Sequence, residues 1–181
     1  MSVIEDFESV VASYAGSKYG VAVDSCVHAI FLSLLYLKEM GEIHDGMKIM
    51  IPNQTFRSVP NYIHHAGLVP MGADIEWEWY YQLYPTRVFD SALLFEEGIY
   101  IPDTFFCLSF QYRKTLPIGR GGMILTDDKD AVERLKELRL NGRDGWNMYL
   151  LPEQAARGLT LFEMMQKKRG SEDYPDWTVS Q

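Results

Sequence analysis

The sequence predicts an α/β fold with a mostly parallel sheet, and two observations carry this prediction. Short apolar runs typical of buried strands alternate along the chain with longer segments of helical periodicity. The 181 residues are 47% hydrophobic and 23% charged, which is typical of a globular chain. That length is sufficient for one domain with a real core.

The individual elements are predicted from periodicity and from their end signals. Ile4, Phe7, Val11 and Tyr14 recur at helical spacing, and Gly16 ends that helix. Ser25 is a good N-cap for the next helix. The expected strands are 19–23, 47–51, 68–71, 87–90, 105–110 and 123–126, and the further helices are 29–40, 56–66, 131–140 and 153–165. The aromatic segment 77–84 has no clear period and is left unassigned.

The bulk properties narrow the function classes. A net charge of -8 argues against a nucleic-acid-binding surface, although backbone amides and hydroxyls can still hold an anion. Cys26 and Cys107 lie in apolar runs and are expected to be free thiols, and no metal-ligand spacing appears. Residues 1–7 lack the character of a signal peptide and no apolar run approaches 18 residues, so we expect no membrane contact and a cytoplasmic location. We expect one α/β domain over 1–170 and a polar tail over 171–181.

Lys114 is the most informative residue of the chain. It follows an apolar strand that ends near Ser109, and a glycine-rich turn and a second apolar strand come after it. A lysine held between two buried strands is expected to lose part of its solvation, which makes its amine a better nucleophile toward carbonyls. Such a lysine is suited to a Schiff base. The alternative is an ordinary surface lysine after a strand.

Four further segments accompany the Lys114 segment in a recognisable order. Asp90 ends a strand in an Asp-x-Ala pattern, and Ser25-Cys26-Val27 lies between a strand and an apolar helix, where free amides could hold a phosphate. Phe56 closes a Pro-x-x-Thr-aromatic loop, and Asn147 lies in a Gly-x-Asn stretch that leads to Gln-Ala-Ala. Taken alone, each also fits a structural interpretation as a cap, a helix start, a core ring or a turn.

Together these motifs resemble the DegT/StrS family of pyridoxal-phosphate-dependent nucleotide-sugar aminotransferases, from about residue 7 to residue 159. The resemblance implies that pyridoxal 5'-phosphate is the cofactor and that Lys114 and Asp90 are catalytic, Lys114 as the Schiff-base lysine and Asp90 opposite the pyridine nitrogen. It implies cofactor contacts from Ser25, Cys26, Val27, Phe56, Asp90, Ser109, Lys114 and Asn147. In this family the aromatic residue matched by Phe56 stacks on the ring, and the residue matched by Asn147 reaches the partner's phosphate, so a homodimer is expected.

The implied fold is an aspartate-aminotransferase-like (PLP-transferase type I) large domain in a truncated form. Only fifteen residues separate Asp74 from Asp90, where the family has a further βα unit, and the family's small C-terminal domain has no counterpart in the sequence. Cys26 stands at the usual glycine, Val27 at the usual threonine and Leu93 at the usual Gln or His. Val27 has no hydroxyl to donate, so one expected phosphate bond is lost.

The implied activity is transfer of an amino group from an amino-acid donor to a keto-sugar nucleotide, as in polysaccharide biosynthesis. A catalytically reduced binding or scaffold protein with the same fold is the alternative. A third possibility is that another chain supplies the missing parts.

Overall fold

The computed structural model describes residues 2–140 and 146–169. The tail expected at 171–181 lies outside these residues. The elements are α1 Val3–Ala15, β1 Tyr19–Val23, α2 Cys26–Glu39, β2 Lys48–Pro52, α3 Ser58–His65, β3 Val69–Ala73, β4 Tyr81–Gln82, β5 Val88–Ser91, β6 Phe105–Ser109, β7 Gly122–Thr126, α4 Lys129–Arg139 and α5 Pro152–Arg169. All the expected helices and strands are present, with ends shifted by a few residues.

The central sheet has the strand order β1-β7-β6-β5-β4, and β2 and β3 form a separate parallel pair. Within the larger sheet β5 and β6 are parallel, whereas β1–β7, β6–β7 and β4–β5 are antiparallel. The α/β class is as expected, but the prediction of a mostly parallel sheet is wrong for this sheet. Apolar runs buried on both faces look alike in either direction, so the sequence pattern did not reveal the reversal.

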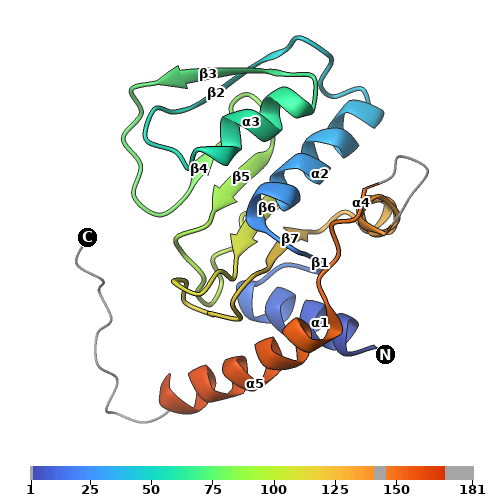
Figure 1. The fold of residues 1–181 in the computed structure, drawn as a ribbon, viewed down its shortest axis with the longest axis vertical. Coiled ribbons are helices and arrows are strands. Elements are labelled where there is room, and N and C mark those ends of the chain that lie inside the picture. Colours follow the sequence, from blue (N-terminus) through green and yellow to red (C-terminus); the bar gives the residue numbers. More distant parts are fainter. Residues whose placement is uncertain (1, 141–145, 170–181) are drawn as a thin grey trace.

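Helices cover both faces of the sheet (Figure 1). Along β1, Val21 and Val23 pack into the cluster formed with α2, α3 and α4, whereas Ala22 packs toward α1 and α5. The same alternation in β6 sends Phe105 to the first cluster and Phe106 to the second. Burial on both faces explains why these strands read as continuous apolar runs.

Local signals account for the helix ends. Ser2 and Glu5 form a reciprocal capping box at the start of α1, and Gly16 ends the helix with a φ of 89°. The third helix was expected to begin at Phe56, but it begins at Ser58 and carries Pro60 in its first turn. Proline is tolerated there because the first amides of a helix have no partner within the helix.

The unassigned aromatic segment 77–84 contains β4, which joins the two sheets. Tyr81 and Gln82 pair with β5, and Tyr84 forms a backbone bridge with Met50 of β2. The Met50 amide donates to the Tyr84 carbonyl at 2.8 Å and the Tyr84 amide donates back at 3.1 Å. Tyr80 packs edge-on against Phe106, with ring centroids 5.5 Å apart. The segment therefore covers the lateral edge of the sheet, where β5 would otherwise be the outermost strand.

Candidate functional site

A cavity of about 830 Å³ lies at the end of the sheet where β1, β5 and β6 finish, and loops and helix starts line it. Its walls include almost all the residues that the motifs singled out, namely Ser25, Cys26, Val27, Phe56, Asp90, Ser109 and Lys114. These residues come from four separate segments of the chain. Ser25, Phe56, Asp90 and Lys114, which lie far apart in the sequence, therefore meet at one cavity.

Lys114 lies in the loop between β6 and β7, where its amide donates to the Gln111 carbonyl at 2.9 Å. The side chain is half-buried and lines the cavity. Lys114 lies at a cavity, as a ligand-binding lysine should. It is in the loop that connects the two strands, however, and is not held between them as the sequence suggested. Its amine is thus reachable from the cavity.

Asp90 ends β5 and is 5% exposed. Its Oδ2 accepts from the Tyr81 hydroxyl at 2.8 Å, and its Oδ1 accepts from the Ala92 amide at 3.0 Å and from the Cys26 thiol at 3.7 Å. Burial raises the pKa of Asp90, while these hydrogen bonds and the nearby Lys114 oppose the rise. The result is a buried carboxyl with several donors, directed into the cavity.

Tyr81 supports Asp90 and was missed at the sequence level. Its hydroxyl also contacts Thr55, the residue before Phe56, so one phenol connects β5 with the loop that carries Phe56. Burial and the Asp90 charge raise the pKa of Tyr81. Trp77 packs edge-on against Tyr81 at 4.9 Å and lines the cavity. Position 81 lies in the segment without a period, so no sequence signal identified it.

Phe56 is 69% exposed and lines the cavity. This rules out the alternative interpretation of Phe56 as a core ring. Leu93 also lines the cavity and is largely exposed. An exposed aromatic face at a cavity is available to stack on a flat ligand.

The start of α2 lies very close to β7. A Cβ at Gly122 would come within 2.5 Å of the Ser25 carbonyl carbon and 2.6 Å of the Cys26 amide nitrogen. The Ser25 hydroxyl caps α2 by accepting from the His28 amide at 3.3 Å. The Cys26 side chain points away from the helix start, toward Asp90 and the Cys107 carbonyl. Gly122 thereby lets the first turn of α2 lie against β7 at the wall of the cavity.

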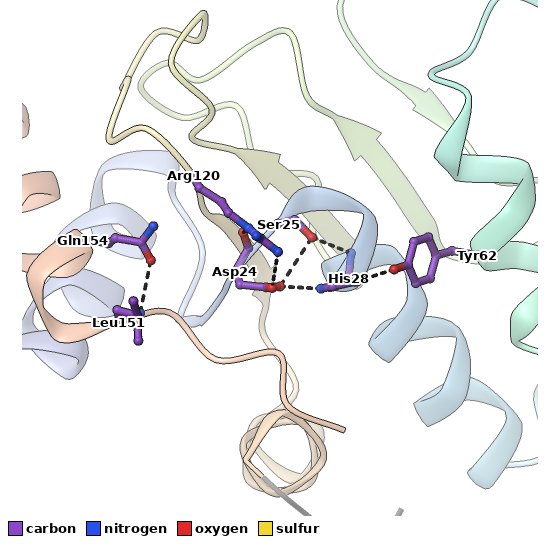
Figure 2. Close-up of polar contacts among 7 residues, drawn as sticks. All are labelled: Asp24, Ser25, His28, Tyr62, Arg120, Leu151 and Gln154. Atoms are coloured by element: carbon purple, nitrogen blue, oxygen red, sulfur yellow. Dashed lines mark hydrogen bonds and ion pairs between the residues drawn. The ribbon is translucent and has the colours of Figure 1, made fainter. Parts of the chain in front are cut away.

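A polar chain crosses this helix start (Figure 2). Arg120 donates to Asp24 Oδ2 at 2.8 Å, His28 Nδ1 contacts Asp24 Oδ1, and His28 Nε2 lies 2.7 Å from the Tyr62 hydroxyl. Burial raises the pKa of Asp24, but the contacts from His28 and Arg120 outweigh it and the pKa is lowered overall. Asp24 is therefore an ionised carboxylate held between two basic side chains. Asp24 and His28 are four residues apart, a spacing that brings side chains together on a helix, and this is the one part of the contact series that the sequence shows.

Asn147 does not line the cavity. Its backbone forms a bridge with Leu140, and its side chain is exposed. The neighbouring Met148 carbonyl accepts from the Asp24 amide at 3.0 Å, which ties this segment to the end of β1. Gln154 accepts from the Leu151 amide at 3.3 Å at the start of α5 (Figure 2). The role implied for Asn147, toward a partner's phosphate, stays a prediction.

Comparison with known proteins decides the family. The model of the DegT/DnrJ/EryC1/StrS aminotransferase family matches residues 2–89 and 102–160. The chain belongs to this family. The resemblance inferred from the motifs is therefore confirmed.

The relatives extend this finding. Spore coat polysaccharide biosynthesis protein SpsC of Bacillus subtilis is 27% identical over 81% of this chain and 48% of its own length. The structure of DesI in the presence of its TDP-sugar product superposes with a TM-score of 0.72 at 19% identity, over 93% of this chain and 55% of DesI. The structure of NtdA from Bacillus subtilis with bound cofactor PMP superposes with a TM-score of 0.74 at 20% identity, over 92% of this chain and 49% of NtdA.

These likenesses confirm the aminotransferase fold. The chain spans about half the length of the curated relative and of the solved structures it matches. The first matched range ends at residue 89, so Asp90 lies in the unmatched stretch 90–101. The assignment of Asp90 therefore depends on its place in the cavity and not on the matched ranges.

No helix in the described part of the chain has both the length and the apolar character needed to cross a bilayer.

Proposed function

We propose that this protein binds pyridoxal phosphate in the cavity and transfers an amino group to a keto-sugar carried on a nucleotide. The observation that carries the proposal is the presence of the Lys114 amine and the buried Asp90 carboxyl on the walls of one cavity. Family membership supports the reaction class. The names of SpsC and of DesI with its TDP-sugar product support the substrate class.

The residues present fit this cofactor. Asp90 is a buried carboxyl that can pair with a protonated ring nitrogen, Phe56 offers an exposed aromatic face, and the first turn of α2 offers amides to a phosphate. When bound, the cofactor supplies an electron sink beside the substrate nitrogen. Ser109, half-buried at the end of β6, is the proposed hydroxyl contact from the opposite wall.

Lys114 has two proposed tasks. Its amine would hold the cofactor at its aldehyde, and it would also hold and return a proton at the reacting carbon of the substrate. The half-buried position in the β6–β7 loop leaves Nζ reachable from the cavity. Asp90 would pair with the ring nitrogen and favour its charged form.

Borohydride reduction of the protein with bound cofactor tests this proposal. Mass spectrometry should find the reduced adduct on the peptide that contains Lys114. Lys114→Ala should abolish it, whereas Lys129→Ala, an exposed lysine at the start of α4, should not. An adduct on another lysine, or no adduct at saturating cofactor, would contradict the assignment.

The competing proposal is a binding or scaffold protein that holds the cofactor without turnover. Incubation with keto-sugar nucleotides and an amino-acid donor separates the two. An amino-sugar nucleotide that forms only when Lys114 is present supports the enzyme. Adduct formation on Lys114 without any amino-sugar product supports the scaffold.

A further inference from the structure

The first turn of α2 is poor in hydroxyl groups that are free to bind a ligand. Val27, the second residue of the helix, lines the cavity and has no hydroxyl. The Ser25 hydroxyl is engaged within the chain, since it accepts from the His28 amide at 3.3 Å and donates to Asp24 Oδ1 at 3.4 Å. A dianion at this turn would meet backbone amides but little side-chain donation from α2 itself.

Tyr62 brings a hydroxyl to this turn from α3. Its oxygen lies 2.7 Å from His28 Nε2 (Figure 2). Both side chains line the cavity. The ring is fixed on two further sides by edge contacts with Phe31 and His65, with centroids 5.6 Å and 5.7 Å away. A phenol held in this way loses little additional freedom when it binds a ligand.

The polar chain holds the Tyr62 hydroxyl beside the first turn of α2. The ionised Asp24 carboxylate can only accept, so His28 Nδ1 carries a proton toward it. A phosphate at this turn would offer the Tyr62 hydroxyl a charged acceptor in place of His28 Nε2. Asp24, itself held by Arg120, keeps His28 in place beside Tyr62. His65 also packs edge-on against the Tyr62 ring.

We propose that Tyr62 is a phosphate-binding residue of this site and supplies the hydroxyl that Val27 cannot. His28 and Asp24 are positioning residues that hold Tyr62 at the first turn of α2. This inference rests on the proposed function, because the phosphate is that of the bound pyridoxal phosphate. It assigns a task to side chains from the β1–α2 loop, α2 and α3 that the catalytic proposal does not use.

The test compares the dissociation constants of pyridoxal phosphate and pyridoxal, measured by absorbance titration. The ratio of the two isolates the phosphate contacts. Tyr62→Phe keeps the ring and removes the hydroxyl. It should weaken the binding of pyridoxal phosphate by about 10- to 100-fold, as expected for the loss of one hydrogen bond to a charged group. Pyridoxal affinity should stay unchanged, which also reports an intact cavity. His28→Ala should show the same pattern.

A rescue variant makes the test specific. Val27→Thr restores a hydroxyl on the first turn of α2 and should recover most of the lost affinity in the Tyr62→Phe background. Tyr36→Phe is the matched control, because its hydroxyl contacts Asp128, a residue absent from the walls of the cavity.

The outcomes separate the two proposals. A Tyr62→Phe protein with an unchanged ratio, or with equal losses for both ligands, overturns the role of Tyr62 and leaves the proposed function standing. A wild-type protein that binds neither ligand overturns both.

Discussion

At the scale of single residues, Asp90 combines burial with function. It is 5% exposed, and Tyr81, Ala92 and Cys26 all donate to it. A buried charge is tolerated when such donors surround it and when an opposite charge can bind beside it. Asp90 is therefore expected to lower the stability of the cofactor-free protein and to stabilise the complex with the cofactor.

Asp90→Asn should lower transamination by about 10- to 100-fold, because the charge that pairs with the ring nitrogen is lost while the side-chain size is nearly kept. The folded content should change little. Single-turnover assays and circular dichroism would measure the two effects. Full activity in the variant would show that Asp90 is not the partner of the ring nitrogen.

The raised pKa of Asp90 also gives a pH dependence with a definite sign. A carboxyl whose pKa is higher in the folded state stabilises the fold below its unfolded pKa, and this contribution is lost as the pH rises through the folded pKa. The ordinary value for Asp is 3.8, so the stability of the wild type relative to Asp90→Asn should fall as the pH rises above about that value. Urea unfolding of both cofactor-free proteins across the acid range measures this difference. A difference that grows with pH would reverse the sign and contradict the argument.

The motif residues of the site were predictable from sequence, whereas their supports were not. Ser25, Asp90 and Lys114 each follow or end an apolar run, and strand ends of a sheet gather ligands at one edge. The contact between Tyr62 and His28 spans 34 residues, and the pair of Arg120 with Asp24 spans 96. Such contacts depend on how α3 and the β6–β7 loop pack, which no local pattern in the chain records.

At the scale of elements, the close approach of β7 to α2 positions the phosphate end of the proposed site. Gly122→Ala would place a Cβ 2.5 Å from the Ser25 carbonyl carbon, so the first turn of α2 must move. We expect a loss of cofactor affinity of at least about tenfold, together with reduced stability. Titration and thermal unfolding would measure the two effects.

Gly158→Ala is the matched comparison for that prediction. Its Cβ would meet the Phe7 ring at 2.5 Å where α5 packs on α1, a contact that does not involve the walls of the cavity. It should reduce stability without changing the affinity of the remaining folded protein. Equal effects of both glycine variants on affinity would show that the approach of β7 to α2 has no special role.

A buried ion pair joins α1, β1 and α4. Glu8 is 3% exposed and accepts from the Ala22 amide at 2.9 Å, and Arg139, 6% exposed, contacts the same carboxylate. Glu8→Leu should lower the free energy of unfolding by about 3–5 kcal/mol, because the Arg139 charge is left buried. Arg139→Met in the same background should recover part of the loss in urea unfolding. A Glu8→Leu protein as stable as the wild type would contradict this account.

The elements were also predicted unevenly. Helices α1 and α2 have clear caps and periods, so their positions followed from sequence. The two-residue strand β4 did not, since its place depends on pairing with β5 and on the bridge to Met50. A short strand of this kind has no period that distinguishes it from a loop.

At the scale of the whole molecule, the β2–β3 pair and the neighbouring Tyr84 carry several exposed apolar side chains. Met50, Val69, Met71 and Tyr84 are 39% to 57% exposed, and Met50 pairs with both Met71 and Tyr84. Apolar surfaces of this kind often mark interfaces. Asn147, exposed and outside the cavity of its own chain, has a task at the proposed site only if a second subunit presents it.

We therefore expect a homodimer whose sites each combine residues of two subunits. Light scattering should give twice the 20.9 kDa chain mass. Asn147→Ala should lower the affinity for pyridoxal phosphate without changing that mass, because an exposed side chain adds little to folding.

Mixing two variants that each lack a different residue of the proposed site tests the shared site directly. A dimer of one Lys114→Ala subunit and one Asn147→Ala subunit contains one site with both residues intact and one with neither. Mixed and refolded subunits should therefore regain borohydride-trapped cofactor at limiting concentration, when neither variant alone retains it. A monomer that binds the cofactor tightly, or a mixture no better than its parts, would remove Asn147 from the site, because a residue acting within its own chain cannot complement across subunits.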